Sequence, residues 1–212
     1  MGITERKERE RTSRKKNILD AAIAIISDKG FDQVTMEEIA QKAELSKGSL
    51  YHYFRDKSAL HMAIKKRGLQ TIHSNFLSFL NSDKTGSKIV EEMGYSFIEF
   101  VNNNPIYTHA LSLNSQLSFQ EEEEELNEIE NKILLLITHA LQVGIQDKSI
   151  EATVDPKILA IQIEFCLRGI LQFYYTNQRN HIFNILKENN MTVADTLKFF
   201  IDTILNQLDK KN

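Results

Sequence analysis

Residues 35–54, TMEEIAQKAELSKGSLYHYF, predict two short helices joined by a tight turn. Thr35 and Glu38 have the spacing of a capping box, in which the side chain of each residue accepts a hydrogen bond from the backbone N–H of the other. Ser46 is a second candidate N-cap, and Leu50 and Phe54 then share one helix face because they are four residues apart. The predicted helices are 36–43 and 47–54.

Further helices are predicted on both sides of this pair. Between 14 and 29 the apolar residues recur at the spacing of one helix face, and Gly30 stands where a helix ends. Those apolar residues are Ile18, Ala22, Ile25 and Ile26. Asp56 can cap a fourth helix that continues toward Leu80, and the polar stretch 81–87 then marks the best domain boundary.

The rest of the chain is expected to be helical as well. Asp155 and Pro156 supply an N-cap followed by proline at the first helical position, and Thr192 or Asn190 can cap the last helix. With only eight Gly and two Pro, the chain has little of the turn chemistry of a many-stranded fold, so an all-α protein is expected. The expected helices are 87–103, 106–118, 121–146, 155–177 and 191–210.

Charge divides the chain into a basic front and an acidic rear. Residues 1–68 carry 15 Lys and Arg against 10 Asp and Glu, whereas residues 69–212 carry 11 against 19. A compact basic module suggests a polyanionic partner, although charge scatter alone could produce the difference. A sequence motif is therefore needed to decide whether the basic front binds a polyanion.

Several classes of protein are excluded by what the sequence lacks. One Cys cannot form an internal disulfide, and neither a signal peptide nor 18 consecutive apolar residues occur, so the cytoplasm is the expected compartment and no membrane is involved. No phosphate-binding glycine loop is present, and Cys166 reads as a small buried hydrophobe. No two histidines have metal-binding spacing; they are His52, His61, His73, His109, His139 and His181. We expect no enzyme, metal or cofactor.

The segment from Ile18 to Leu60 resembles the DNA-binding domain of TetR-type transcriptional regulators, the tetracycline-repressor family. About a fifth of the chain carries the resemblance, which implies a helix-turn-helix whose second helix recognises DNA. The matching motifs are Lys29-Gly30-Phe31, Thr35 with Ile39-Ala40, Ser46-Lys47-Gly48-Ser49-Leu50-Tyr51-His52-Tyr53-Phe54, and Lys57.

The second helix of such a pair enters the major groove, so its first turn must be slim and able to donate hydrogen bonds. Lys47 can donate to guanine, Gly48 lets the backbone approach the bases, and Ser49 can donate or accept. Helix N-termini suit phosphate oxygens. The resemblance implies base contacts near Met36 and at 47–49. The full predicted DNA-binding set is Thr35, Met36, Ser46, Lys47, Gly48, Ser49, Tyr51, His52, Tyr53 and Lys57.

Each of these residues also has an ordinary structural interpretation. Tyr51 or Tyr53 could be a half-buried core aromatic, and His52 a surface histidine. The family often has Gly where this chain has Glu44, and a left-handed non-glycine residue there would cost roughly 1 kcal/mol. Glu37 and Glu44 also place negative charge near the DNA face, which should lower non-specific affinity.

The rear helices are expected to form a homodimer, because one helix-turn-helix makes few base contacts. The stretch 158–175 is apolar almost all round and therefore needs cover on both sides, and the resemblance implies a four-helix bundle between two copies. Burial within one subunit is the alternative. The predicted interface residues are Leu167, Ile170, Leu171, Tyr174, Leu197, Phe200, Ile204 and Leu208.

The resemblance also implies a pocket for an effector in the rear domain. Glu164, Arg168 and Gln172 form one polar stripe on the otherwise apolar helix, which could line such a pocket or could be a simple exposed ion pair. The predicted ligand-binding residues are Phe97, Phe100, Tyr107, His109, His139, Phe165, Arg168 and Gln172.

Together these features predict a ligand-responsive transcriptional regulator, most simply a repressor, that binds a palindromic operator in double-stranded DNA as a homodimer and is released by a small molecule. A DNA-binding or architectural factor without a ligand is the alternative. The expected division is a charged arm at 1–13, a helix-turn-helix domain at 14–60, a connecting helix and boundary at 61–86, and a helical effector-binding and dimerisation domain at 87–212.

Overall fold

The computed structural model describes residues 2–112, 120–151, 153, 155–176 and 181–208. These residues form helices and connecting loops with no strand among them, so the predicted all-α class is confirmed. Contacts divide the chain into two compact units, Met1–Lys65 and Lys66–Asn212, with the division inside one helix, α4. Each unit buries apolar side chains of its own.

Unit 1 contains α1 (Ile3–Lys29), α2 (Met36–Lys42), α3 (Lys47–Tyr53) and the start of α4 (Lys57–Phe79). The capping box predicted for α2 is present, Ser46 caps α3, and Asp56 Oδ1 accepts from the Ala59 N–H at 2.7 Å at the start of α4. Gly30 ends α1 at φ 79°. Glu44 makes the α2–α3 turn at φ 56°, which confirms the expected left-handed residue.

The first helix is longer than the sequence predicted. Apolar periodicity placed its start at residue 14, but α1 begins at Ile3. Residues 4–17 are all exposed and so carry no apolar stripe to detect. They form a helix because Glu, Lys and Arg have good helix propensity and because the folded part of α1 removes the cost of nucleation.

The core of unit 1 holds the two short helices in place. Leu50 of α3 is fully buried, as are Ile39 of α2 and Ile18 of α1. α1 packs on α2, and α2 packs on α3. Because α3 buries one face only, its opposite face stays exposed. The other buried apolar residues of this unit include Ala22, Ile26, Val34, Met36, Ala40, Phe54, Leu60 and Ile64.

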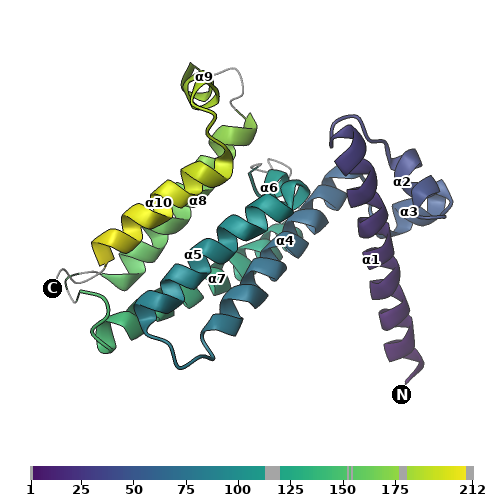
Figure 1. Ribbon diagram of the computed structural model, residues 1–212. Coiled ribbons are helices and arrows are strands. Elements are labelled where there is room, and N and C mark those ends of the chain that lie inside the picture. Colours follow the sequence, from purple (N-terminus) through teal and green to yellow (C-terminus); the bar gives the residue numbers. More distant parts are fainter. Residues whose placement is uncertain (1, 113–119, 152, 154, 177–180, 209–212) are drawn as a thin grey trace. The chain divides into compact units, whose positions relative to one another are not determined.

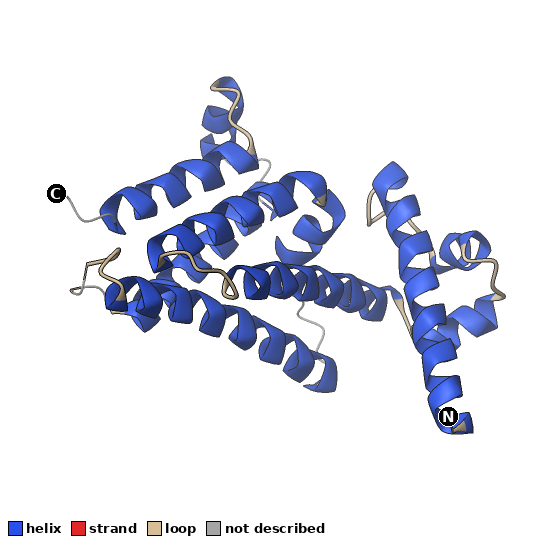
Figure 2. Ribbon diagram, turned by 60° about the horizontal axis from the view of Figure 1, so that its bottom comes forward, coloured by secondary structure: helices blue, strands red, loops and turns tan. Residues whose placement is uncertain are grey.

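Among its described residues, unit 2 contains the rest of α4 and six further helices. α5 packs against α7 and α10, while α8 packs against α6, α7 and α10 (Figures 1 and 2). The six helices are α5 (Gly86–Asn103), α6 (Pro105–Ser112), α7 (Gln120–Gln146), α8 (Pro156–Thr176), α9 (His181–Glu188) and α10 (Val193–Leu208).

The sequence did not predict every helix of unit 2. α9 was not predicted, because an eight-residue helix between polar stretches gives too short an apolar pattern to stand out. The end of the helix expected at 106–118 lies outside the described residues, within which α6 runs to Ser112. The predicted caps are confirmed for α8 by Asp155, which accepts from the N–H groups of Lys157 and Ile158, and for α10 by Thr192, which accepts from Asp195.

The backbones at the start of α5 and near the end of α7 lie in close contact. A Cβ atom on Gly86 would overlap the backbone nitrogen of Gly144, so only glycine fits there. The Gly86 N–H donates to Asp147 Oδ2 at 2.7 Å, and the Ser87 N–H donates to Ser149 Oγ at 3.0 Å. Burial opposes the charge of Asp147, but the hydrogen bonds outweigh it and lower the pKa of this carboxyl.

Candidate nucleic-acid interface and internal cavity

The first turn of α3 is exposed and polar. The Ser49 N–H donates to Ser46 Oγ at 3.1 Å, and the two hydroxyls lie 2.8 Å apart. Lys47, Gly48 and Ser49 are all exposed, and a Cβ atom on Gly48 would meet nothing within 4 Å. This turn therefore presents a slim surface with donors and acceptors, as contact with base edges requires.

Lys47 carries its own counter-ion in this structure. Its Nζ pairs with Glu37 of α2 and lies 5.9 Å from the centroid of the Tyr51 ring. The hydrogen bond between Lys47 and Glu37 lowers the pKa of the Glu37 carboxyl and raises the pKa of the lysine. Both side chains are largely exposed, so a competing partner can reach either one.

Glu38 is the centre of a group of hydrogen bonds at the N-terminus of α2. Lys29 Nζ donates to Glu38 Oε1 at 2.6 Å, and the Thr35 N–H donates to Glu38 Oε2 at 2.9 Å. These bonds, with the Lys29 bond the strongest influence, lower the pKa of Glu38 to about 2. The Thr35 hydroxyl also donates to Glu38 at 3.1 Å. A phosphate at Thr35 would have to compete with this carboxylate.

The remaining candidates of the motif lie around the end of α3. Tyr51 and His52 are exposed, and Tyr53 is half-buried with its ring against that of His52. Lys57 Nζ donates to the Asp32 carbonyl at 3.0 Å and lies over the Phe31 ring at 4.8 Å. Lys57 therefore has two partners within unit 1.

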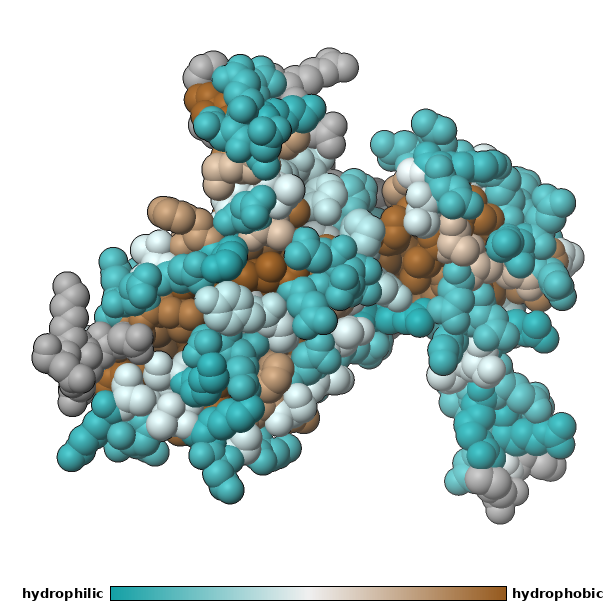
Figure 3. Space-filling model, viewed as in Figure 1, coloured by the Kyte–Doolittle hydropathy of each residue, from teal (hydrophilic) through white to brown (hydrophobic). Residues whose placement is uncertain are grey.

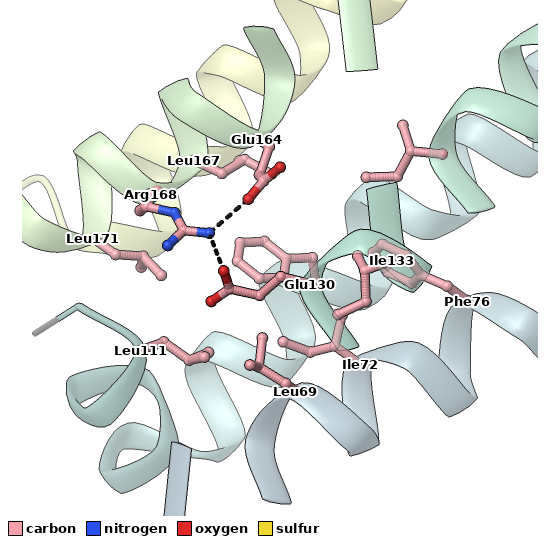
Figure 4. Close-up of a pocket in the computed structure, with 12 residues that line it drawn as sticks. Leu69, Ile72, Phe76, Leu111, Glu130, Ile133, Glu164, Leu167, Arg168 and Leu171 are labelled. Atoms are coloured by element: carbon pink, nitrogen blue, oxygen red, sulfur yellow. Dashed lines mark hydrogen bonds and ion pairs between the residues drawn. The ribbon is translucent and has the colours of Figure 1, made fainter. Parts of the chain in front are cut away.

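Unit 2 has a small, partly open cavity of about 90 Å³ between its helices (Figure 4). Apolar side chains from α4, α5, α6, α7 and α8 form most of its wall. The lining residues are Leu69, Ile72, Phe76, Phe97, Leu111, Glu130, Ile133, Ile137, Glu164, Leu167, Arg168 and Leu171.

One side of the cavity wall is charged. Arg168 Nη2 donates to Glu164 Oε1 at 2.6 Å within α8 and lies 3.1 Å from Glu130 Oε2 of α7 (Figure 4). Burial opposes the charge of Arg168, but the two carboxylates outweigh burial and raise the pKa of the guanidinium. One cation between two anions leaves this triad with a net charge of about −1 at neutral pH.

A family model described as bacterial regulatory proteins of the tetR family matches residues 18–64, which span α2, α3 and parts of α1 and α4. The matched segment is therefore of the TetR type. It contains the whole stretch from Ile18 to Leu60 on which the resemblance rests, and the matched family is described as regulatory proteins, as the sequence predicted in preference to an enzyme.

Individual known proteins are similar to this chain in sequence or in fold. Nucleoid occlusion factor SlmA of Haemophilus ducreyi is 31% identical over 100 residues, 47% of this chain and 50% of that protein. The chain thus spans about half the length of the SlmA proteins that it matches.

Two solved structures share the fold over nearly the whole chain. A TetR/AcrR regulator from Thermobifida fusca has a TM-score of 0.70 at 17% identity, covering 92% of this chain and 97% of that one. FadR of Bacillus subtilis in complex with stearoyl-CoA has a TM-score of 0.66 at 17% identity, covering 91% and 98%. At these identities the likeness shows the fold alone.

One of the residues predicted to contact DNA has a buried side chain. Met36 is only 7% exposed because its side chain belongs to the core of unit 1, so only its backbone could reach DNA. The other nine predicted residues lie at the surface or are half-buried around α3 and the N-terminus of α2.

Only Phe97 and Arg168 of the predicted ligand-binding residues line the cavity. Phe165 is 67% exposed and points away from the core, and His139 is also exposed. The others lie outside the lining: Phe100 is buried, Gln172 and Tyr107 are half-buried, and the half-buried His109 packs edge-on against the Tyr175 ring at 5.3 Å. Sequence reasoning missed Glu130, because nothing linked it to Arg168 on another helix.

Several residues of the predicted dimer face pack within this chain. Leu171, Leu197 and Leu208 are buried inside this chain, and Leu167 lines the cavity, because these residues face the other helices of unit 2. Ile170, Phe200 and Ile204 are half-buried, and the half-buried Tyr174 lies within hydrogen-bond distance of Met191 O and Thr196 Oγ1. Cys166, expected to be buried, is exposed because it lies on the outer face of α8.

The described residues lack two kinds of feature. They contain no group of three His, Cys, Asp or Glu side chains arranged to hold a metal ion. None of their helices is both long and apolar enough to cross a membrane.

Replacing Arg168 should make stability depend on pH. Arg168→Met leaves Glu130 and Glu164 together in an apolar wall, which raises the folded-state pKa of at least one of them above about 4.3. A raised carboxyl pKa destabilises the fold at high pH, and the loss is regained as protonation proceeds. Urea unfolding should show a deficit of about 1–2 kcal/mol at pH 8 that shrinks toward pH 5.

Lys132→Met is the matched control, because Lys132 forms an exposed ion pair with Glu128 on α7. Its unfolding free energy should differ little from that of the parent protein at either pH. A deficit in Arg168→Met that is the same at both values would show that the triad does not hold its charge as described.

Proposed function

We propose that the chain is a ligand-responsive transcriptional regulator, a repressor that binds a palindromic operator as a homodimer and is released by a small molecule. The observation that carries this proposal is the exposed polar first turn of α3, held on a helix-turn-helix within the segment that the TetR family model matches.

DNA recognition is assigned to α3 in the major groove. Lys47 and Ser49 would reach base edges, while Gly48 allows the backbone to come close. Tyr51, Tyr53 and Lys57 are assigned to phosphates, as the resemblance implies. To contact a base, Lys47 must leave its ion pair with Glu37. A hydrogen bond to guanine O6 or N7 compensates for this loss, whereas a base without an acceptor in reach does not.

Removal of the Lys47 side chain should weaken operator binding selectively. A base contact of this kind is worth about 1–3 kcal/mol, so Lys47→Ala should lose about tenfold or more in affinity, measured by fluorescence anisotropy on DNA from directly upstream of its own gene. Lys132→Ala, on the exposed side of α7, is the control and should bind like the parent. Equal affinities for the two variants would argue against the role of α3.

Dimerisation is assigned to the outer faces of α8 and α10, which pack on each other within the chain. Phe165 is 67% exposed and Phe199 is 72% exposed. The exposed stripe of α8 continues through Ile158, Gln162, Cys166 and Gly169 at helical spacing. Large exposed aromatics on adjoining helices favour cover by a second copy, which would bring four helices together.

A charge on this face should break the dimer. Phe165→Asp and Phe199→Asp should each convert the protein to monomers, because a buried carboxylate without a partner is costly. The measurement is light scattering after size exclusion. Leu135→Asp is the control: Leu135 of α7 is 65% exposed and lies outside the proposed face, so this variant should stay dimeric.

Cys166 supplies a second readout of the same interface. It is the one cysteine of the chain, and its thiol is exposed in the protomer. Maleimide labelling of Cys166 should therefore be slow in the parent dimer and fast in Phe165→Asp. Fast labelling of a parent protein that is dimeric by scattering would place the dimer contact elsewhere.

Effector binding is assigned to the cavity of unit 2. FadR of Bacillus subtilis was solved with stearoyl-CoA, which supports a small molecule as the effector class here. The cavity of about 90 Å³ is apolar over most of its wall and has the Arg168 triad on one side. A ligand with an apolar body and a polar group that reaches the triad fits this wall.

Filling the cavity should abolish release without harming operator binding. Ile133→Phe adds bulk to the wall, so a molecule found to release the parent protein from its operator should fail to release this variant. Leu135→Phe, two residues further on and on the outside of α7, should respond like the parent. Normal release of Ile133→Phe would move the effector site away from the cavity.

A DNA-binding factor without an effector is the second candidate. It is favoured by the similarity to SlmA, which is named a nucleoid occlusion factor. An apolar cavity with a charged triad in its wall favours the ligand-responsive regulator instead. The two differ in one result: the second candidate predicts that no small molecule alters operator affinity.

A further inference from the structure

The N-terminal half of α1 is an exposed charged helix that the functions above leave unused. Residues 4–17 are exposed throughout, and Figure 3 shows this part of the molecule as almost wholly hydrophilic. Figure 1 shows it projecting beyond α2 and α3, which pack at the other end of α1. Residues 2–17 contain seven Lys and Arg against three Glu.

The cations of this segment are sorted by helix face. Lys7, Arg11 and Arg14 follow each other at spacings of four and three residues, which places them on one stripe of an α-helix. The same stripe continues into Ile18 and Ala22, which are fully buried. We call Lys7, Arg11 and Arg14 the basic stripe.

The remaining cations lie beside the basic stripe or away from it. At about 100° of rotation per residue, Lys15 lies about 40° from Arg11 at the edge of the stripe, Arg6 lies about 100° from Lys7 on the flank, and Arg9 and Lys16 lie on the opposite side. Arg6 Nε lies 2.9 Å from Glu10 Oε1, and Arg9 Nε donates to the Glu5 carbonyl at 3.4 Å. Within the described residues, no ion pair involves Lys7, Arg11 or Arg14.

We propose that the basic stripe is a second DNA-contacting surface, which binds the phosphates that flank the half-site read by α3. This inference rests on the proposed function. The stripe continues the face of α1 that packs on α2, so it lies on the side of α1 that carries the helix-turn-helix. Its cations are therefore on the same side of the unit as α2 and α3.

The dimensions of the basic stripe match a nucleic-acid backbone. Seven residues of helix between Lys7 and Arg14 span about 10 Å. Successive phosphates of one DNA strand advance by roughly 3.4 Å along the axis, so the stripe can follow about three of them. Cations without internal partners are the ones that release counter-ions when they meet phosphate, and this release strengthens binding.

The test compares two triple variants with the same change in charge. The stripe variant is Lys7→Gln, Arg11→Gln, Arg14→Gln, and the control variant is Arg6→Gln, Arg9→Gln, Lys16→Gln. Gln has nearly the helix propensity of Lys and Arg, so circular dichroism should show α1 intact in both. The probes are the shortest duplex protected in a footprint upstream of the gene, and the same duplex with ten further base pairs on each side.

The stripe variant should lose the affinity that the longer duplex adds, weakening binding to that duplex by about tenfold or more, while the control variant keeps most of it. The slope of log K against log salt should fall by roughly 0.9 for each lost contact, about 5 for six cations in a dimer. Salt titration by anisotropy measures both quantities.

Three results would overturn the proposal. The first is an equal loss of affinity in the two variants, which would mean that only the total charge of α1 matters. The second is no loss of affinity in either variant. The third is no gain in affinity from the longer duplex, which would assign the basic stripe to another partner such as an acidic protein. If Lys47→Ala weakens DNA binding and the stripe variant does not, the proposal for the basic stripe fails while the proposed function stands. If the parent binds none of the duplexes, the proposed function fails.

Discussion

The recognition surface depends on the burial of one side chain. A seven-residue helix is too short to be stable in water by itself, so α3 forms because Leu50 is fully buried in the core of unit 1 and Ser46 caps the first turn. Leu50 therefore fixes both the existence and the rotation of α3. With that face committed inward, Gly48 and Ser49 are turned away from the core, and Lys47, about one turn before Leu50, is exposed at the start of the helix. The chemistry at the surface follows from the packing below it.

Local signals predicted the front of the protein well. The capping box of Thr35 and Glu38 and the Gly30 helix end are decided by neighbours in sequence, so a reader of the sequence has the needed information. The left-handed Glu44 was likewise expected from the turn that its position must make. The start of α1 was missed for a physical reason: a helix that is exposed on all sides leaves no apolar period.

In unit 2, the side chains that face the interior were harder to predict, because α8 is apolar almost all round. On such a helix, periodicity does not say which residues face the interior, and α8 in fact turns Leu171 inward and Phe165 outward. The cavity adds a second difficulty. Arg168 and Glu164 are one helical turn apart and could be paired from the sequence, whereas Glu130 joins them from α7 through tertiary packing alone. The glycine contact between Gly86 and Gly144 is of the same kind.

The ion pair between Lys47 and Glu37 has a consequence for which bases α3 can tolerate. When Lys47 turns to a base, Glu37 loses its partner and needs a donor of its own. A G·C pair offers both halves of the exchange: guanine O6 and N7 accept from a lysine, and the amino group of cytosine donates to a carboxylate. An A·T pair offers the same two kinds of group, because adenine N7 and thymine O4 accept from a lysine and the adenine amino group donates to a carboxylate. The ion pair can thus open without leaving a charge unpartnered wherever the bases under α3 present an acceptor to Lys47 and a donor to Glu37 at the same time.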